Sequence, residues 1–115
     1  NTGLKDVFFR METKRKSAVI AISMEHRDPE IQELFFEQFL ELKTLLHSEL
    51  EEEWEWSLNF PDENGKIISQ IYKELPGKSV LNKDDWPDLI SFFKPRIIVL
   101  DAFWENAQCA FDSLK

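Results

Sequence analysis

The order of the predicted elements constrains this chain most strongly, because one plan occurs twice. Two predicted strands followed by an amphipathic helix occupy residues 5–50, and the same order returns over residues 53–114. The helices begin on similar signals, Asp-Pro-Glu at residues 28–30 and Asp-Asp-Trp-Pro-Asp at residues 84–88. Such signals favour a helix start, since the acidic side chain caps free N–H groups and proline has no N–H to leave unpaired. The two halves therefore share the order of their elements, and we do not take this as proof of a sequence duplication.

Alternation of apolar and polar residues predicts two hairpins. The first has strands at residues 6–12 and 17–25, joined by a polar turn at residues 13–16. The second has strands at residues 53–60 and 66–75, and the pair Asn64-Gly65 in its turn supplies the positive φ angles that tight turns require. Together they predict an antiparallel sheet of about four strands.

The first predicted helix is apolar over most of its circumference. Phe36, Leu40 and His47 lie roughly 120–170° around the axis from its main apolar face. A helix of this kind must be covered from more than one direction. The main face consists of residues spaced by three and four, namely Ile31, Leu34, Phe35, Phe39, Leu42, Leu45 and Leu46.

The second helical segment allows two interpretations around Pro95. It begins near Asp85, and proline in a helix interior removes a hydrogen bond and disfavours helix in the preceding residue. Residues 96–100 are short, apolar and mostly β-branched, which also fits a strand. We favour a kinked helix, because a helical face continues beyond Asp101. Its apolar residues before the proline are Trp86, Leu89, Ile90, Phe92 and Phe93.

These elements predict one α+β domain over residues 1–115. We expect an antiparallel sheet of about four strands with two long helices packed on one face, in the order ββαββα. A chain of 115 residues is long enough for one core and too short for two domains.

Charge and composition exclude several classes of protein. The net charge of −8 argues against a direct, nonspecific nucleic-acid binder, whose affinity rests on Lys and Arg. Every apolar run, including residues 97–100, is far shorter than the ~20 residues of a membrane span. A single cysteine, Cys109, leaves no internal disulfide and fits a reducing compartment. We therefore expect a cytoplasmic protein that does not bind membranes.

An acidic stripe marks the first helix as a candidate contact surface. Glu33, Glu37 and Glu41 stand four residues apart, although such like-charged pairs destabilise a helix by a few tenths of a kcal/mol. Phe36 and Leu40 flank the stripe. An ordinary solvated face explains the charges, and so does a surface for a protein partner or a second copy of the chain. The function that we predict is a non-enzymatic protein-interaction or accessory domain.

The alternative function is a nucleic-acid-associated auxiliary domain or a degenerate nuclease. Glu12-Thr13-Lys14 resembles the acidic-x-Lys element of metal-dependent nucleases, which need a second carboxylate to hold a divalent cation. Glu12 and the basic residues Lys14, Arg15 and Lys16 would then make the contacts. This alternative predicts acidic side chains that converge within metal-bridging distance, or a basic groove. The polar end of a hairpin is the simpler explanation.

No catalytic constellation emerges from the remaining polar residues. His26, His47 and Cys109 have no metal-ligand spacing, and no nucleophile motif is present. We therefore expect no catalytic residue, no metal and no cofactor. A small-molecule enzyme is a weaker option, which would depend on a perturbed carboxylate such as Asp101 if residues 96–100 form a strand.

Residues 34–43, together with residues 82–87 and 92–98, resemble a family of small bacterial proteins known only as a domain of unknown function. The resemblance covers nearly all of the chain. It implies an accessory module, since in longer relatives a similar domain follows a restriction-endonuclease-like nuclease domain. The shared residues are mostly aromatic core residues and helix-start signals, so the resemblance implies no chemistry.

Overall fold

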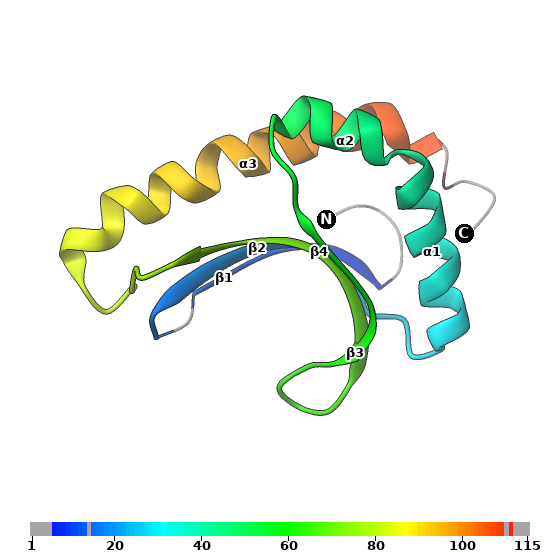
Figure 1. The fold of residues 1–115 in the computed structure, drawn as a ribbon, viewed down its shortest axis with the longest axis horizontal. Helices are drawn as coiled ribbons and strands as arrows, with labels where there is room; N and C mark the ends of the chain where they lie inside the picture. The colour runs from blue at the N-terminus through cyan, green and yellow to red at the C-terminus, as the bar shows by residue number, and fades with distance from the viewer. Residues whose placement is uncertain (1–5, 14, 110, 112–115) are drawn as a thin grey trace.

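The computed structural model describes residues 6–13, 15–109 and 111 of the 115-residue chain. The prediction of an α+β domain with a four-stranded antiparallel sheet is confirmed (Figure 1). The elements in chain order are β1 (Val7–Thr13), β2 (Ser17–Met24), α1 (Pro29–Glu41), α2 (Lys43–Leu50), β3 (Glu55–Pro61), β4 (Ile67–Pro76), the 3-10 helix η1 (Lys83–Asp85) and α3 (Trp86–Ala107).

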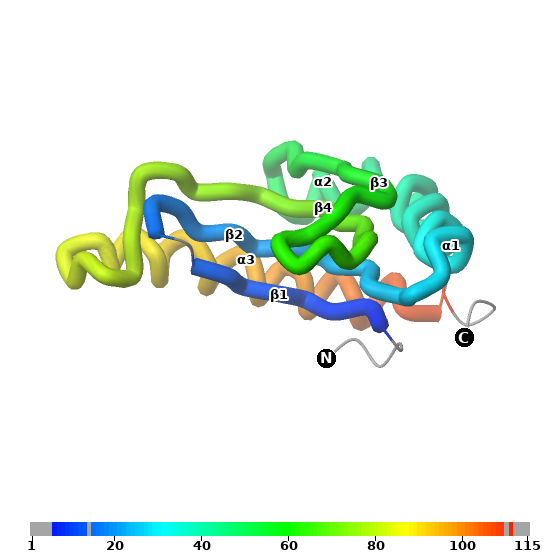
Figure 2. The backbone as a smooth tube through the Cα atoms, turned by 90° about the horizontal axis from the view of Figure 1, so that it is seen from below, coloured from blue at the N-terminus to red at the C-terminus, as the bar shows by residue number. Residues whose placement is uncertain are grey.

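The sheet joins the two hairpins through their second strands. Its order is β1-β2-β4-β3, and every neighbouring pair is antiparallel. The central pairing runs from Ser17 opposite Pro76 to Met24 opposite Ser69. Consequently the first strand of each hairpin, β1 or β3, forms an edge of the sheet (Figure 2).

The helices cover one face of the sheet, and the core lies between the two layers (Figure 1). Alternate residues of β2 point into it, and Ile20, Ile22 and Met24 are fully buried. Phe39 of α1 and Phe103 of α3 close the same cluster from above. Burying aromatic side chains of this size contributes most of the apolar area of a small core.

The prediction of two long helices in the order ββαββα is wrong, since there are three helices in the order ββααββα. The first predicted helix breaks at Leu42, whose backbone leaves the helical region with φ −100° and ψ 7°. No proline or glycine causes the break. A straight continuation would carry the last turns away from the sheet, whereas the break turns α2 so that Leu46 is fully buried and α2 contacts α3.

Residues 96–100 are helical, as the favoured interpretation predicts, and α3 continues through Pro95. The strand alternative is wrong, because Leu100 and Phe103 belong to the face of α3 that is buried against the sheet and α1. This burial stabilises the helix across the residue that interrupts its hydrogen-bond ladder.

The additional apolar side of α1 is covered in part by the second hairpin. Phe36 is 7% exposed and meets Trp56 of β3 edge to face, with ring centroids 5.6 Å apart. Gln32 on the same helix is fully buried, where it donates to the carbonyl of Ile67 at 2.7 Å and accepts from Ser69 at 2.8 Å. These contacts fix α1 over β4 and β3.

Candidate functional site

An apolar groove of about 560 Å³ lies between β1 and the N-terminal half of α3. Met11 and Thr13 of β1 form one wall, and Val80 in the connection from β4 also lines the groove. The opposite wall consists of α3 residues, namely Trp86, Leu89, Ile90, Phe93, Lys94 and Ile97. Large apolar side chains that line such a hollow mark contact surfaces more reliably than scattered ones.

The groove exists because α3 is long for the sheet that it covers. Its 22 residues span about 33 Å, and its first turns lie toward the end of the molecule where the first hairpin turns (Figure 1). Leu89 and Phe92 reach the core there, whereas Ile90 remains 61% exposed and Trp86 45% exposed. Met11 on the facing strand is 52% exposed.

Polar contacts in the preceding connection hold the start of α3 in place. The indole N–H of Trp86 donates to the carbonyl of Val80 at 2.8 Å. Asp85 accepts from the backbone N–H of Ser79 at 3.0 Å, and Lys78 forms an ion pair with Asp88 at 2.8 Å. The wall made by Trp86 and Ile90 is therefore built into the structure.

The groove runs beside the regular edge of the sheet. β1 pairs with β2 over its full length without a register shift. The other edge, β3, is irregular, since its register with β4 shifts between Ser57 and Phe60, and Asn59 has a φ of 48°. A bulge of this kind protects an edge against further strand pairing.

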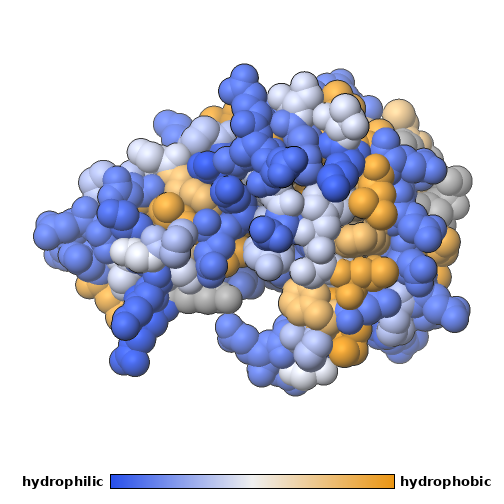
Figure 3. Space-filling model, viewed as in Figure 1, coloured by the Kyte–Doolittle hydropathy of each residue, from blue (hydrophilic) through white to orange (hydrophobic). Residues whose placement is uncertain are grey.

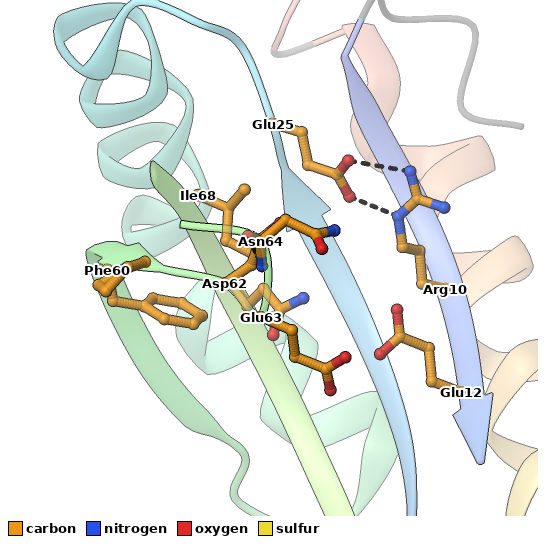
Figure 4. A pocket seen from close by; sticks show the side chains of 10 residues that line it. Arg10, Glu12, Glu25, Phe60, Asp62, Glu63, Asn64 and Ile68 are labelled. Carbon is orange, nitrogen blue, oxygen red and sulfur yellow. Dashed lines mark hydrogen bonds and ion pairs between the residues drawn. The ribbon is translucent and has the colours of Figure 1, made fainter. Parts of the chain in front are cut away.

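The opposite face of the sheet carries an acidic cleft of about 370 Å³ beside the β3–β4 hairpin. In Figure 4, Arg10 pairs with Glu25 on one side of the cleft, Glu12 lies on the same strand as Arg10, and Asp62 and Glu63 lie on the hairpin. Figure 3 shows a hollow below the sheet next to this hairpin.

Three charged groups of this cleft, Arg10, Glu25 and Asp62, have structural partners. An Arg10 Nη2 donates to Glu25 Oε1 at 2.9 Å, and Arg10 Nε also contacts Glu25. Burial opposes ionisation of Glu25, but hydrogen bonds from Arg10 and Ser23 and the charges of Arg10 and Lys66 outweigh it and lower its pKa. Asp62 accepts from the backbone N–H groups of Asn64 and Lys66 and so shapes the turn.

The structure separates the residues predicted for the α1 contact surface. Glu33, Glu37 and Glu41 are exposed, and Leu40 is 42% exposed. Phe36 instead contacts Trp56 within the same chain. Apolar side chains (orange) form a band beside α1 and the β3–β4 hairpin on the face shown in Figure 3.

The residues predicted for nucleic-acid contact do not form a common site in the described part of the chain. Glu12 lies in the acidic cleft, whereas Arg15 and Lys16 are exposed at the hairpin turn. Lys14 lies outside the described residues. Among residues 6–13, 15–109 and 111, no three His, Cys, Asp or Glu side chains are grouped so that they could hold a metal ion.

The apolar residues of the groove are visible in the sequence, but their helical spacing predicts a buried side of the helix and not an exposed groove. Trp86, Ile90 and Phe93 belong to the helical apolar pattern, which normally marks a core-facing side. Only the position of α3 relative to β1 leaves Ile90 exposed. None of the helices in the described part of the chain has the length and apolar character that a membrane crossing requires.

Comparison with known proteins gives one result. Neither the curated proteins nor the solved structures contain a match to the chain. A family model described as a domain of unknown function (DUF4268) matches residues 1–108. This match covers almost the whole chain, which therefore belongs to the family that shares this domain of unknown function.

Proposed function

We propose that this protein is a non-enzymatic interaction domain that binds polypeptide in the groove between β1 and α3. The observation that carries the proposal is the exposure of Met11, Trp86 and Ile90 around one apolar groove. Burying apolar surface contributes about 25 cal/mol per Å². These side chains therefore supply a driving force for association.

The edge strand adds hydrogen bonds to that driving force. An extended segment that pairs with a sheet edge gains main-chain hydrogen bonds, and alternate side chains enter adjacent pockets. β1 offers the edge, and the groove lies on the side to which Met11 and Thr13 point. The two features together suit an extended apolar segment.

The groove lining favours binding over chemistry. Among its described lining residues, Lys94 supplies the charged group and Thr13 the hydroxyl, and the other residues are apolar. The convergent polar groups that are typical of active sites are not found in this lining. The proposal includes an accessory role in the cytoplasm. In longer proteins this role would be exercised beside a nuclease domain, as the family resemblance implies.

The exposed side of α1 is a second proposed contact surface. Leu40 and the carboxylates of Glu33, Glu37 and Glu41 would suit a partner that carries basic residues around an apolar side chain. Phe36 would support this surface from below through its contact with Trp56.

A displayed library of random 12-residue peptides tests the groove. We expect enriched peptides with alternating apolar residues, and we expect Ile90→Glu to weaken their binding at least tenfold, because it places a charge in the groove. Ile98→Glu is the matched control, since Ile98 is 56% exposed on the same helix and does not line the groove. Absence of enriched peptides, or binding that survives Ile90→Glu, contradicts the proposal unless a second copy of the chain fills the groove.

A further inference from the structure

We propose that a second copy of this chain occupies the groove and its edge, through antiparallel β1–β1 pairing about a two-fold axis at Met11. The inference rests on the proposed function, because it names the polypeptide that binds beside the groove. It would join two four-stranded sheets into one sheet of eight strands, with both groups of helices on the same face.

The two sheet edges differ in their suitability for such pairing. β1 is regular throughout its pairing with β2, and no proline lies within it. β3 ends in Pro61 and has the register shift near Asn59. Natural edges are usually protected by prolines, bulges or inward-pointing charges. β1 has none of these on the side of the groove, where Met11 and Thr13 lie.

The hydrogen-bond pattern determines which residues face the second copy. The backbone N–H of Glu25 donates to the carbonyl of Asp6 at 2.7 Å. Hydrogen-bonded and non-bonded pairs alternate along an antiparallel ladder, so Phe8, Arg10 and Glu12 are the residues that bond to β2. The N–H and C=O groups of Met11 and Thr13 therefore point outward, away from β2.

Side-chain charge selects the register. If Met11 faces Met11 of the second copy, Arg10 of each chain lies opposite Glu12 of the other, and Phe9 lies opposite Thr13. A shift by one residue pair in one direction places Arg10 opposite Arg10. A shift in the other direction places Glu12 opposite Glu12. Opposite charges stabilise cross-strand pairs and like charges destabilise them, so of these three registers only the Met11-centred one is complementary.

The groove agrees with the same axis. Met11 points to the helix-covered side, where it forms a wall of the groove with Ile90 and Ile97. In Figure 2, α3 passes behind β1 and β2, near the free edge. Two-fold pairing brings the two grooves side by side, so Met11 of each copy covers apolar surface of the other. Such a self-complementary patch is what a closed dimer requires.

Disulfide cross-linking tests the axis. In a Cys109→Ser background, Met11→Cys should form a disulfide-linked dimer on mild oxidation, because facing Cα atoms of a hydrogen-bonded pair are about 5.5 Å apart. Thr13→Cys is the matched control, since its two copies would lie roughly 13 Å apart along the strands. Equal cross-linking of both variants contradicts the register.

Sedimentation over a range of concentrations tests the charges. The wild-type chain should form dimers, and Glu12→Arg should weaken the dimer about tenfold, because both Arg10–Glu12 pairs become repulsive. Glu55→Arg makes the same change in net charge at an exposed position of the opposite edge strand, β3. It should leave the dimer unchanged or tighter, since it only reduces repulsion between two acidic chains. A weaker dimer in both variants contradicts charge pairing at β1.

The outcomes separate the inference from the function on which it rests. A wild-type chain that stays monomeric, with no Met11→Cys cross-link, overturns the inference. If groove-dependent peptide binding is then retained, the proposed function stands with another partner. Loss of both dimer and peptide binding overturns both. A dimer that Ile90→Glu weakens and Ile98→Glu does not would support both.

Discussion

Glu52 is the side chain that fastens the connection between α2 and β3 to α3. Its carboxylate accepts from Arg96 at 2.8 and 3.0 Å and from the indole of Trp54 at 2.8 Å. Burial opposes its ionisation, but these hydrogen bonds and the charges of Arg96 and Lys73 prevail and lower its pKa. The ionised form is therefore the one that stabilises the fold.

Glu52→Gln should lower the free energy of unfolding at neutral pH by about 1.5–3 kcal/mol, which is typical of a hydrogen bond to a charged group. Because the folded pKa is lowered, the stabilisation is present above the unfolded value of 4.5 and is lost as pH falls through the folded value. Urea denaturation at about pH 7 and about pH 3 should show the difference between variant and wild type shrink in acid.

Glu105→Gln provides the control for Glu52→Gln, since Glu105 is exposed on α3. It should leave stability within about 0.5 kcal/mol of wild type at both pH values. A Glu52→Gln deficit that persists unchanged in acid would show that the carboxylate charge is not its source.

Helix α3 is unusual because it contains a proline, Pro95, in its interior. Proline cannot donate to the carbonyl of Ser91 one turn earlier. One residue further on, Arg96 adds a side-chain bond to the helix, since its Nη1 donates to the carbonyl of Phe92 at 2.9 Å. Packing of the flanking turns holds the helix together across this gap.

Pro95→Ala should raise the free energy of unfolding by about 1–3 kcal/mol, because it restores the missing N–H and removes an unfavourable helix residue. Thermal denaturation followed by circular dichroism would measure the gain. Ser91→Ala, an exposed change on the same helix, should have an effect of less than about 0.5 kcal/mol. A loss of stability on Pro95→Ala would show instead that the core requires the bend.

Local patterns predicted the strands well, because alternation and turn residues are properties of neighbours in sequence. The second strand starts at Ser17 as predicted, and the turn before β4 contains Gly65 with a φ of 80°. The break at Leu42 could not be predicted in this way, since no local breaker causes it. Sheet order was equally out of reach, because the pairing of β2 with β4 joins distant segments.

The candidate groove could not be predicted from local sequence patterns either. Periodicity identified the apolar side of α3 that includes Trp86 and Ile90, and it normally predicts burial. Whether a given turn is buried depends on what lies beneath it. Ile90 lines the groove beside the edge strand β1 and is 61% exposed, so an apolar pattern typical of a core helix here forms part of the surface.

The whole molecule shares one core, in which Phe111 is a central member. Phe111 is fully buried, and its ring centroid lies 4.6 Å from Phe39 and 5.0 Å from Trp104. It thus packs residues beyond the end of α3 against α1. Because the sheet and the helices contribute to one hydrophobic cluster, we expect them to unfold as one cooperative unit.

Phe111→Ala should lower the free energy of unfolding by about 3–5 kcal/mol, a large share of the ~5–15 kcal/mol of an ordinary domain. Tryptophan fluorescence and far-ultraviolet circular dichroism should still report one coincident urea transition. Leu81→Ala, at a side chain that is 78% exposed, should leave the midpoint nearly unchanged. Two separate transitions in the wild-type protein would contradict a single core.

The meeting of β2 and β4 at the centre of the sheet also bears on how fast the chain folds. Each hairpin can form from neighbouring residues in microseconds. Joining them requires Met24 to find Ser69, with α1, α2 and β3 in the intervening loop. Closing that loop costs entropy before the central ladder and the core return any stabilisation. We therefore expect the pairing of β2 with β4 to form late and to limit the folding rate. A substitution of Ala21, which lies opposite Tyr72 in this pairing, should then change the folding rate as well as the stability.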